Sequence, residues 1–116
     1  MTRPILLCGN EPALLGTRNM VLERAGFITS ICSEHDIASM PHTPPIALTV
    51  LGHSMSKEDV TRTANLVRTK WPHVKILFLT KSDDGVVKTA PDEYKAGSAN
   101  PSHLVQVCQA ILDGSI

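Results

Sequence analysis

The chain alternates short apolar runs with longer segments in which apolar residues recur at helical spacing. Ile5–Cys8, residues 46–51 and residues 74–80 are nearly continuous in apolar side chains. A strand that is covered by helices on both faces has this composition, whereas a strand with one face in water alternates apolar and polar residues. The three runs therefore predict buried strands of a parallel sheet.

Three segments have the apolar spacing of amphipathic helices. In the first, Asn10 is placed to cap the helix, Pro12 suits its first turn and Gly26 ends it. The second, residues 56–71, begins with a serine whose hydroxyl suits the N-cap position, and the third covers residues 101–112. The expected inward positions are Leu14, Arg18, Val21, Leu22 and Ala25, then Val60, Ala64, Val67 and Trp71, and finally Leu104, Val107, Cys108 and Ile111.

The remaining segments are less regular. Residues 27–32 alternate in a β-rich stretch that predicts a second strand, and residues 34–40 predict a weak helix. Residues 81–92 are interrupted by glycine and proline, and they leave room for only a turn or two of helix around residues 86 and 87. A short strand is expected near residues 94–96.

Strands that alternate with helices predict an α/β fold with right-handed crossovers. Five such units form a flavodoxin-like three-layer sandwich, in which a five-stranded parallel sheet of order 2-1-3-4-5 has helices on both faces. Ligands bind such sheets outside the carboxyl ends of the strands, here where strands 1 and 3 part. The 116 residues have the size of one compact domain, so we expect residues 1–116 to form a single domain.

The charge and composition of the chain exclude some classes of binding partner. Eleven basic and eleven acidic residues balance, so the basic field of most nucleic-acid binders is missing and we expect no nucleic-acid partner. The apolar runs are too short to cross a bilayer and the first residues lack the core of a secretion signal, so we expect a soluble, cytoplasmic protein without a membrane partner. Three widely spaced cysteines, Cys8, Cys32 and Cys108, are expected to be buried thiols.

Four segments, taken in order, resemble the receiver domain of two-component response regulators over nearly the full length of the chain. They are residues 5–11 at the first strand, residues 26–27 after the first helix, residues 46–52 at the third strand and residues 76–80 at the fourth. The resemblance implies the receiver fold and its phosphorylation site. In that family two acidic residues after strand 1 hold magnesium, an aspartate after strand 3 accepts the phosphoryl group, a Thr or Ser ends strand 4, and a lysine–proline pair follows strand 5.

The phosphoacceptor of that family has no counterpart in this sequence. Between Asp36 and Glu58 there is no Asp or Glu, and Gly52 is expected at the acceptor position. Phosphoryl transfer to a protein needs a nucleophilic carboxylate, so we expect a degenerate pseudo-receiver that lacks the phosphoacceptor aspartate.

The metal-binding and clamping residues are also depleted. Gly9 and Asn10 match the acidic pair, which leaves Glu11 as the remaining acid, and a single carboxylate makes a poor magnesium site. Thr80 matches the hydroxyl residue, but Gly97 falls near the position of the lysine. We therefore expect neither a metal nor another cofactor.

The candidate ligand-binding residues lie at the predicted carboxyl ends of strands 1, 3 and 4: Gly9, Asn10, Glu11, Gly52, His53, Ser54 and Thr80. His53 and Ser54 have two interpretations: they cap the following helix and satisfy loop carbonyls, or they contact an anion or a small ligand. Neighbours on a tight loop rarely achieve the geometry of a Ser–His nucleophile, so we expect no catalytic residue and no enzymatic activity. Cys8, Cys32 and His53 are a conceivable zinc set, but they lack the short spacing of a structural site.

The sequence predicts a stand-alone receiver-like signalling module of a bacterial pathway, which acts by protein–protein interaction without aspartyl phosphorylation. The expected partner is another signalling protein, or a second copy bound through the face of the last helix. Two alternatives stay open. One is a small-molecule or anion sensor at the carboxyl ends of strands 1 and 3, and the other is an atypical phosphoacceptor receiver that uses a residue such as His53.

Overall fold

The computed structural model describes residues 3–42, 45–81, 85–97 and 101–116. Their centre is one six-stranded sheet with the strand order β2-β1-β3-β4-β6-β5. The strands are β1 Ile5–Cys8, β2 Thr29–Ile31, β3 Leu48–Leu51, β4 Lys75–Thr80, β5 Val87–Ala90 and β6 Glu93–Gly97. The helices are α1 Pro12–Arg24, α2 Glu34–Ile37, α3 Lys57–Lys70 and α4 Pro101–Asp113.

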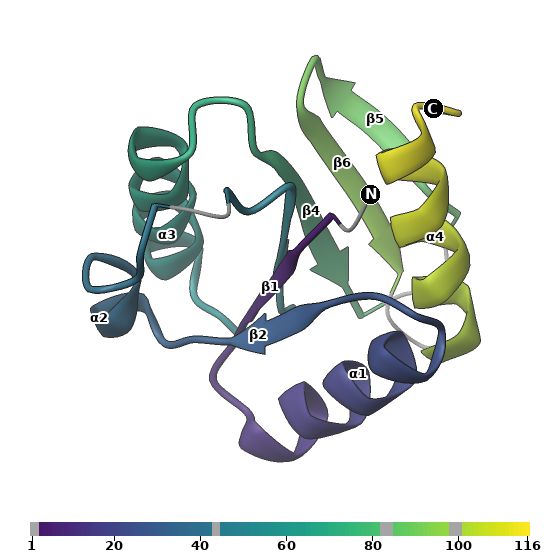
Figure 1. Cartoon of the computed structure of the whole chain (residues 1–116), viewed down its shortest axis with the longest axis horizontal. Coiled ribbons are helices and arrows are strands. Elements are labelled where there is room, and N and C mark those ends of the chain that lie inside the picture. The colour runs from purple at the N-terminus through teal and green to yellow at the C-terminus, as the bar shows by residue number, and fades with distance from the viewer. Residues whose placement is uncertain (1–2, 43–44, 82–84, 98–100) are drawn as a thin grey trace.

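The sheet lies between two layers of helices (Figure 1). Helices α1 and α4 pack on one face, and helices α2 and α3 pack on the other. Side chains of a strand alternate between the two faces, so Ile5 and Leu7 of β1 join the α1/α4 core while Leu6 and Cys8 join the α2/α3 core. The predicted three-layer α/β architecture with both faces covered is confirmed.

The predicted strand order is confirmed for the first four strands. Strands β2, β1, β3 and β4 are parallel neighbours, and the fifth parallel strand, next to β4, is β6. The predicted strands at the start and middle of the chain are confirmed, and the uninterrupted apolar runs correspond to β1, β3 and β4.

The segment between β4 and β6 differs from the prediction. The expected turns of helix around residues 86 and 87 are absent from the described part of this segment, where Val87–Ala90 forms β5 and pairs antiparallel with β6. Residues 91 and 92 form the turn of the hairpin. Val87 and Thr89 are β-branched, which favours a strand once a partner is available to pair with the backbone. The sheet therefore has six strands rather than five, and residues 82–84 of the predicted segment lie outside the described residues.

The start of α1 also corrects a prediction. Its N-cap residue is Glu11 rather than Asn10, and the cap makes no side-chain hydrogen bond. Pro12 is the first helical residue, which moves the cap position one residue past Asn10. Gly26 has a positive φ of 98° that suits glycine, and the predicted end of the helix is confirmed. The buried side chains of the helix are Leu15, Arg18 and Leu22.

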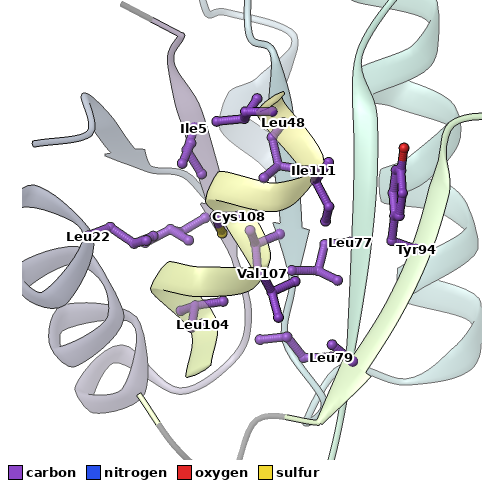
Figure 2. Packing of buried hydrophobic residues seen from close by; sticks show 14 of the residues in the cluster. Ile5, Leu22, Leu48, Leu77, Leu79, Tyr94, Leu104, Val107, Cys108 and Ile111 are labelled. Atoms are coloured by element: carbon purple, nitrogen blue, oxygen red, sulfur yellow. The ribbon is translucent and has the colours of Figure 1, made fainter. Parts of the chain in front are cut away.

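Helices α3 and α4 follow their predicted patterns. The hydroxyl of Ser56 caps α3 by accepting a hydrogen bond from the amide of Asp59 over 3.1 Å. The predicted inward residues of α4 are buried, and Figure 2 shows them facing the sheet between Leu22 of α1 and Tyr94 of β6. No helix among the described residues is long and apolar enough to cross a membrane.

Candidate ligand site at the ends of β1 and β3

The carboxyl ends of β1 and β3 lie side by side, because their last residues, Cys8 and Leu51, are partners in the sheet. Gly9 and Gly52 follow directly. The amide of Gly52 donates a hydrogen bond to the carbonyl of Cys8 over 2.9 Å. A Cβ atom on Gly52 would lie only 3.6 Å from the Cα of Gly9. That separation is an ordinary van der Waals contact, so the two backbones alone would leave room for a side chain at Gly52.

Asn10 connects the two loops. Its side-chain amide donates to the carbonyl oxygen of Ser54 over 3.4 Å, so the predicted capping group of α1 instead bridges to the loop after β3. Ser54 contributes its backbone to this contact, and the cap of α3 is Ser56. The prediction that Ser54 caps the following helix is therefore wrong.

Arg18 of α1 completes the site. Its side chain is 8% exposed. Side chains of a helix lean toward its N-terminus, and α1 begins at the carboxyl end of β1 (Figure 1), so the guanidinium extends to the end of β3. There Nη1 lies 3.2 Å from the position that a Cβ atom would take on Gly52, and Nη2 lies 3.4 Å from Nδ1 of His53.

The contact with Arg18 assigns the tautomer of His53. A guanidinium has donors and no acceptor, so Nδ1 of the imidazole must be the acceptor. The proton of the neutral ring then lies on Nε2. We call Gly9, Asn10, Glu11, Arg18, Gly52, His53 and Ser54 the β1/β3 site.

The electrostatics of the β1/β3 site are dominated by Arg18. Burial lowers the pKa of the Arg18 guanidinium from its ordinary value, and the carboxylate of Glu11 opposes this shift. Glu11 itself is exposed at the start of α1. The site therefore combines a buried cation with an acid at its solvent-facing edge.

Thr80 lies at the same edge of the sheet but belongs to β4. It is the partner of Gly97 in β6, and its hydroxyl donates to the carbonyl of Ala96 over 3.4 Å. This hydrogen bond joins Thr80 to β6, whereas the other predicted residues group around β1 and β3.

Sequence reasoning placed Arg18 on the inner face of α1 but did not assign it to the site. The signal in the sequence is that Arg18 is a charged residue at an inward helical position, because charged residues are rarely buried unless they have a partner. The contact between Arg18 and Gly52 depends on the direction of α1 relative to β3. The spacing of apolar residues in the helix does not determine that direction.

Solved structures share this architecture over nearly their whole length. A response regulator receiver protein from Sinorhizobium medicae WSM419 superposes with a TM-score of 0.73 at 19% identity, covering 99% of this chain and 98% of that chain. A response regulator from Thermotoga maritima gives a TM-score of 0.74 at 13% identity, covering 97% and 99%. The chemotaxis protein CheY4 of Vibrio cholerae gives 0.73 at 14% identity, covering 96% and 99%.

The chain has the fold of a response-regulator receiver. No protein-family model matches it, and the search of curated proteins found no match. The receiver fold with an additional antiparallel strand at one edge is thus established from the architecture.

Magnesium, which the receiver resemblance implies, does not fit the β1/β3 site. A hard divalent cation requires several oxygen ligands, and Glu11 is the carboxylate that this site offers. The guanidinium of Arg18 against Gly52 would repel a cation there.

The conceivable zinc set is not assembled either. Within the part of the chain that the structure describes, no group of three or more His, Cys, Asp or Glu residues is placed to hold a metal. Burial raises the pKa of Cys8 to about 12, with a smaller contribution from Cys32, and burial raises the pKa of Cys32 as well. Both cysteines are buried free thiols, as the sequence predicted.

Proposed function

We propose that this chain is a receiver-like signalling module that acts by binding another protein and accepts no phosphoryl group on aspartate. The observation that supports the proposal is the guanidinium of Arg18, which lies against Gly52 at the end of β3. Gly52 occupies the place at which the receiver resemblance implies the acceptor aspartate.

The chemistry of phosphoryl transfer supports this assignment. Transfer requires a nucleophilic carboxylate, a divalent cation and a cationic clamp that are fixed before the reaction. Gly52 supplies no nucleophile, Glu11 alone holds a metal poorly, and Gly97 falls near the position that the resemblance implies for the clamping lysine. Arg18 supplies a fixed positive charge, which cannot take the place of the nucleophile.

The output is then a contact with another protein, either a different signalling protein or a second copy. Because no covalent modification switches this contact, it depends on the surface that the fold presents in its single chemical state. The association state of the protein is therefore expected to be the same before treatment with a phosphodonor and after the donor and its products have been removed.

The test is the intact mass of the chain after incubation with acetyl phosphate and magnesium, with a receiver that retains its acceptor aspartate as the positive control. The control should gain a phosphoryl group and this chain should not. A gain that hydroxylamine removes would contradict the proposal, because acyl phosphates react in this way. A gain that disappears in His53→Gln would favour an atypical histidine acceptor instead.

A further inference from the structure

The side chain of Arg18 is largely buried, and the protein uses little of the hydrogen-bonding capacity of its guanidinium. None of its nitrogens is among the fully buried atoms without a partner, so the remaining donors reach the surface of the site. It carries five N–H donors in a rigid fork. Among the described residues, its hydrogen-bond contact is the one from Nη2 to Nδ1 of His53, at 3.4 Å. A charge-assisted hydrogen bond is normally shorter, at about 2.7–2.9 Å.

Removing the charge of Arg18 from water costs free energy, and packing alone does not require a charged side chain at this position. Burial lowers the pKa of Arg18, which records the loss of hydration of its charge. Glu11 offsets this loss from an exposed position, where water weakens the attraction. A methionine would fill a similar volume on α1 without placing a charge largely out of water, so the guanidinium indicates a role in recognition.

The position of Arg18 suits a ligand. It lies where the order of parallel strands reverses between β1 and β3, outside the carboxyl ends at which open α/β sheets bind their ligands. Gly52 has no side chain that could accept a hydrogen bond from the guanidinium. The side-chain amide of Asn10 belongs to the same cluster, where one of its two N–H donors bonds the carbonyl of Ser54, and the ring of His53 contacts Arg18. Donors around one cation complement the oxygen atoms of a small anion.

We propose that Arg18 anchors a reversible binding site for a small oxyanion of the phosphate or carboxylate class, with His53 and Asn10 beside it. This inference deepens the proposed function, on which it rests for the absence of a covalent phosphoryl group. The oxyanion would be the non-covalent input of the signalling module. Glu11 competes with the ligand for the guanidinium.

The test is an NMR titration of the full chain with inorganic phosphate and, separately, with acetate, at an ionic strength held constant with chloride. Saturable shifts are expected at the amides of Gly9, Asn10, Gly52 and His53 and at the side chain of Arg18. Saturation by one anion alone assigns the class of the ligand, and saturation by both supports the wider oxyanion class. No saturable shift, or shifts spread over the surface lysines and arginines, would overturn the inference.

Variants test the role of the fork. Arg18→Met should weaken binding by about tenfold or more, whereas the matched control Arg24→Met removes an exposed arginine of the same helix and should bind as the wild type does. Glu11→Gln should tighten binding by removing the competing carboxylate. If Arg18→Met does not fold, Arg18→Lys keeps the charge without the fork and should weaken binding severalfold.

Equal affinity in the wild type and the Arg18 variant would overturn the inference. Its failure can be told apart from failure of the proposed function. Absent phosphate binding with an unchanged mass after acetyl phosphate treatment contradicts the oxyanion site alone. A covalent gain of mass that persists in His53→Gln and that hydroxylamine removes contradicts the proposed function.

Discussion

A Cβ atom on Gly52 would lie 3.2 Å from Nη1 of Arg18, a contact tighter than most side chains tolerate. The relationship means that the end of β3 and the inner face of α1 are adapted to each other: the glycine leaves the space and the arginine closes it. The resemblance to receivers implies an acceptor aspartate at the position of Gly52. The charge, the packing and the proposed chemistry of the β1/β3 site all follow from this pair.

Gly52→Asp should pair its new carboxylate with Arg18 rather than become a phosphoacceptor. Gly52→Ala adds only the Cβ and should cost about 1 kcal/mol of unfolding free energy, because Nη1 of Arg18 must move away from the new atom. Gly52→Asp should be more stable than Gly52→Ala at neutral pH, since a charge-assisted hydrogen bond contributes about 1.5–3 kcal/mol. Urea unfolding of both variants measures the difference.

The same pair of substitutions on an Arg18→Met background is the control. Without the guanidinium the carboxylate has no partner, so the order of stability should reverse. An aspartate variant less stable than the alanine variant when Arg18 is present would show that the guanidinium is not placed to pair.

Arg18→Met should keep or raise the free energy of unfolding, by up to about 2 kcal/mol, because a buried charge is replaced by an apolar chain of similar length. The motivation is the lowered pKa of Arg18, which reflects its burial. The exposed Arg24→Met should change stability by less than about 0.5 kcal/mol. A loss above about 1 kcal/mol in Arg18→Met alone would mean that the guanidinium stabilises the fold.

The backbone amides of β5, at the edge of the sheet, should be less protected from hydrogen exchange than those of β4. Strand β5 is an edge strand, and the side chains of Val87, Lys88 and Thr89 are exposed. Residues with few buried contacts open locally at low free energy. Amides of Val87–Ala90 should therefore exchange with deuterium faster than those of β4. Equal protection would show that the hairpin is covered in solution.

The buried thiol of Cys108 should make the free energy of unfolding fall as the pH rises. Burial raises the pKa of its thiol from 9.0 to about 12, so the neutral thiol is favoured in the folded state. This contribution is complete below the unfolded pKa and is lost as pH rises toward the folded pKa. The stability difference between the wild type and Cys108→Ala should shrink by about 1 kcal/mol between about pH 8 and pH 10. Urea unfolding under reducing conditions measures it, and a constant difference would contradict the burial of the thiol.

Much of the fold could be predicted because local patterns matched the global arrangement. The continuous apolar run of β3 and the spacing of Leu104, Val107, Cys108 and Ile111 in α4 each allow one placement. Strand β5 could not be predicted, since its four exposed or half-buried residues gain their conformation by pairing with β6, a partner that the local pattern does not identify.

The sequence predicts which residues meet at the candidate site, but it does not predict the positive charge at the centre of the site. Gly9, Asn10, Gly52 and Ser54 do meet at the ends of β1 and β3, because the carboxyl ends of parallel strands share one edge of the sheet. The charge at the centre of the site comes from Arg18, two turns into α1, and its reach depends on how the helix lies across the sheet.

A magnesium titration of the wild-type chain, followed by NMR of the backbone amides, tests most directly the proposal that Arg18 leaves the β1/β3 site without a metal. The buried guanidinium and the single acid Glu11 predict no saturable change up to millimolar magnesium. Saturable shifts confined to residues 9–11 and 52–54 at submillimolar magnesium would contradict this, and would show that the β1/β3 site still assembles a metal centre.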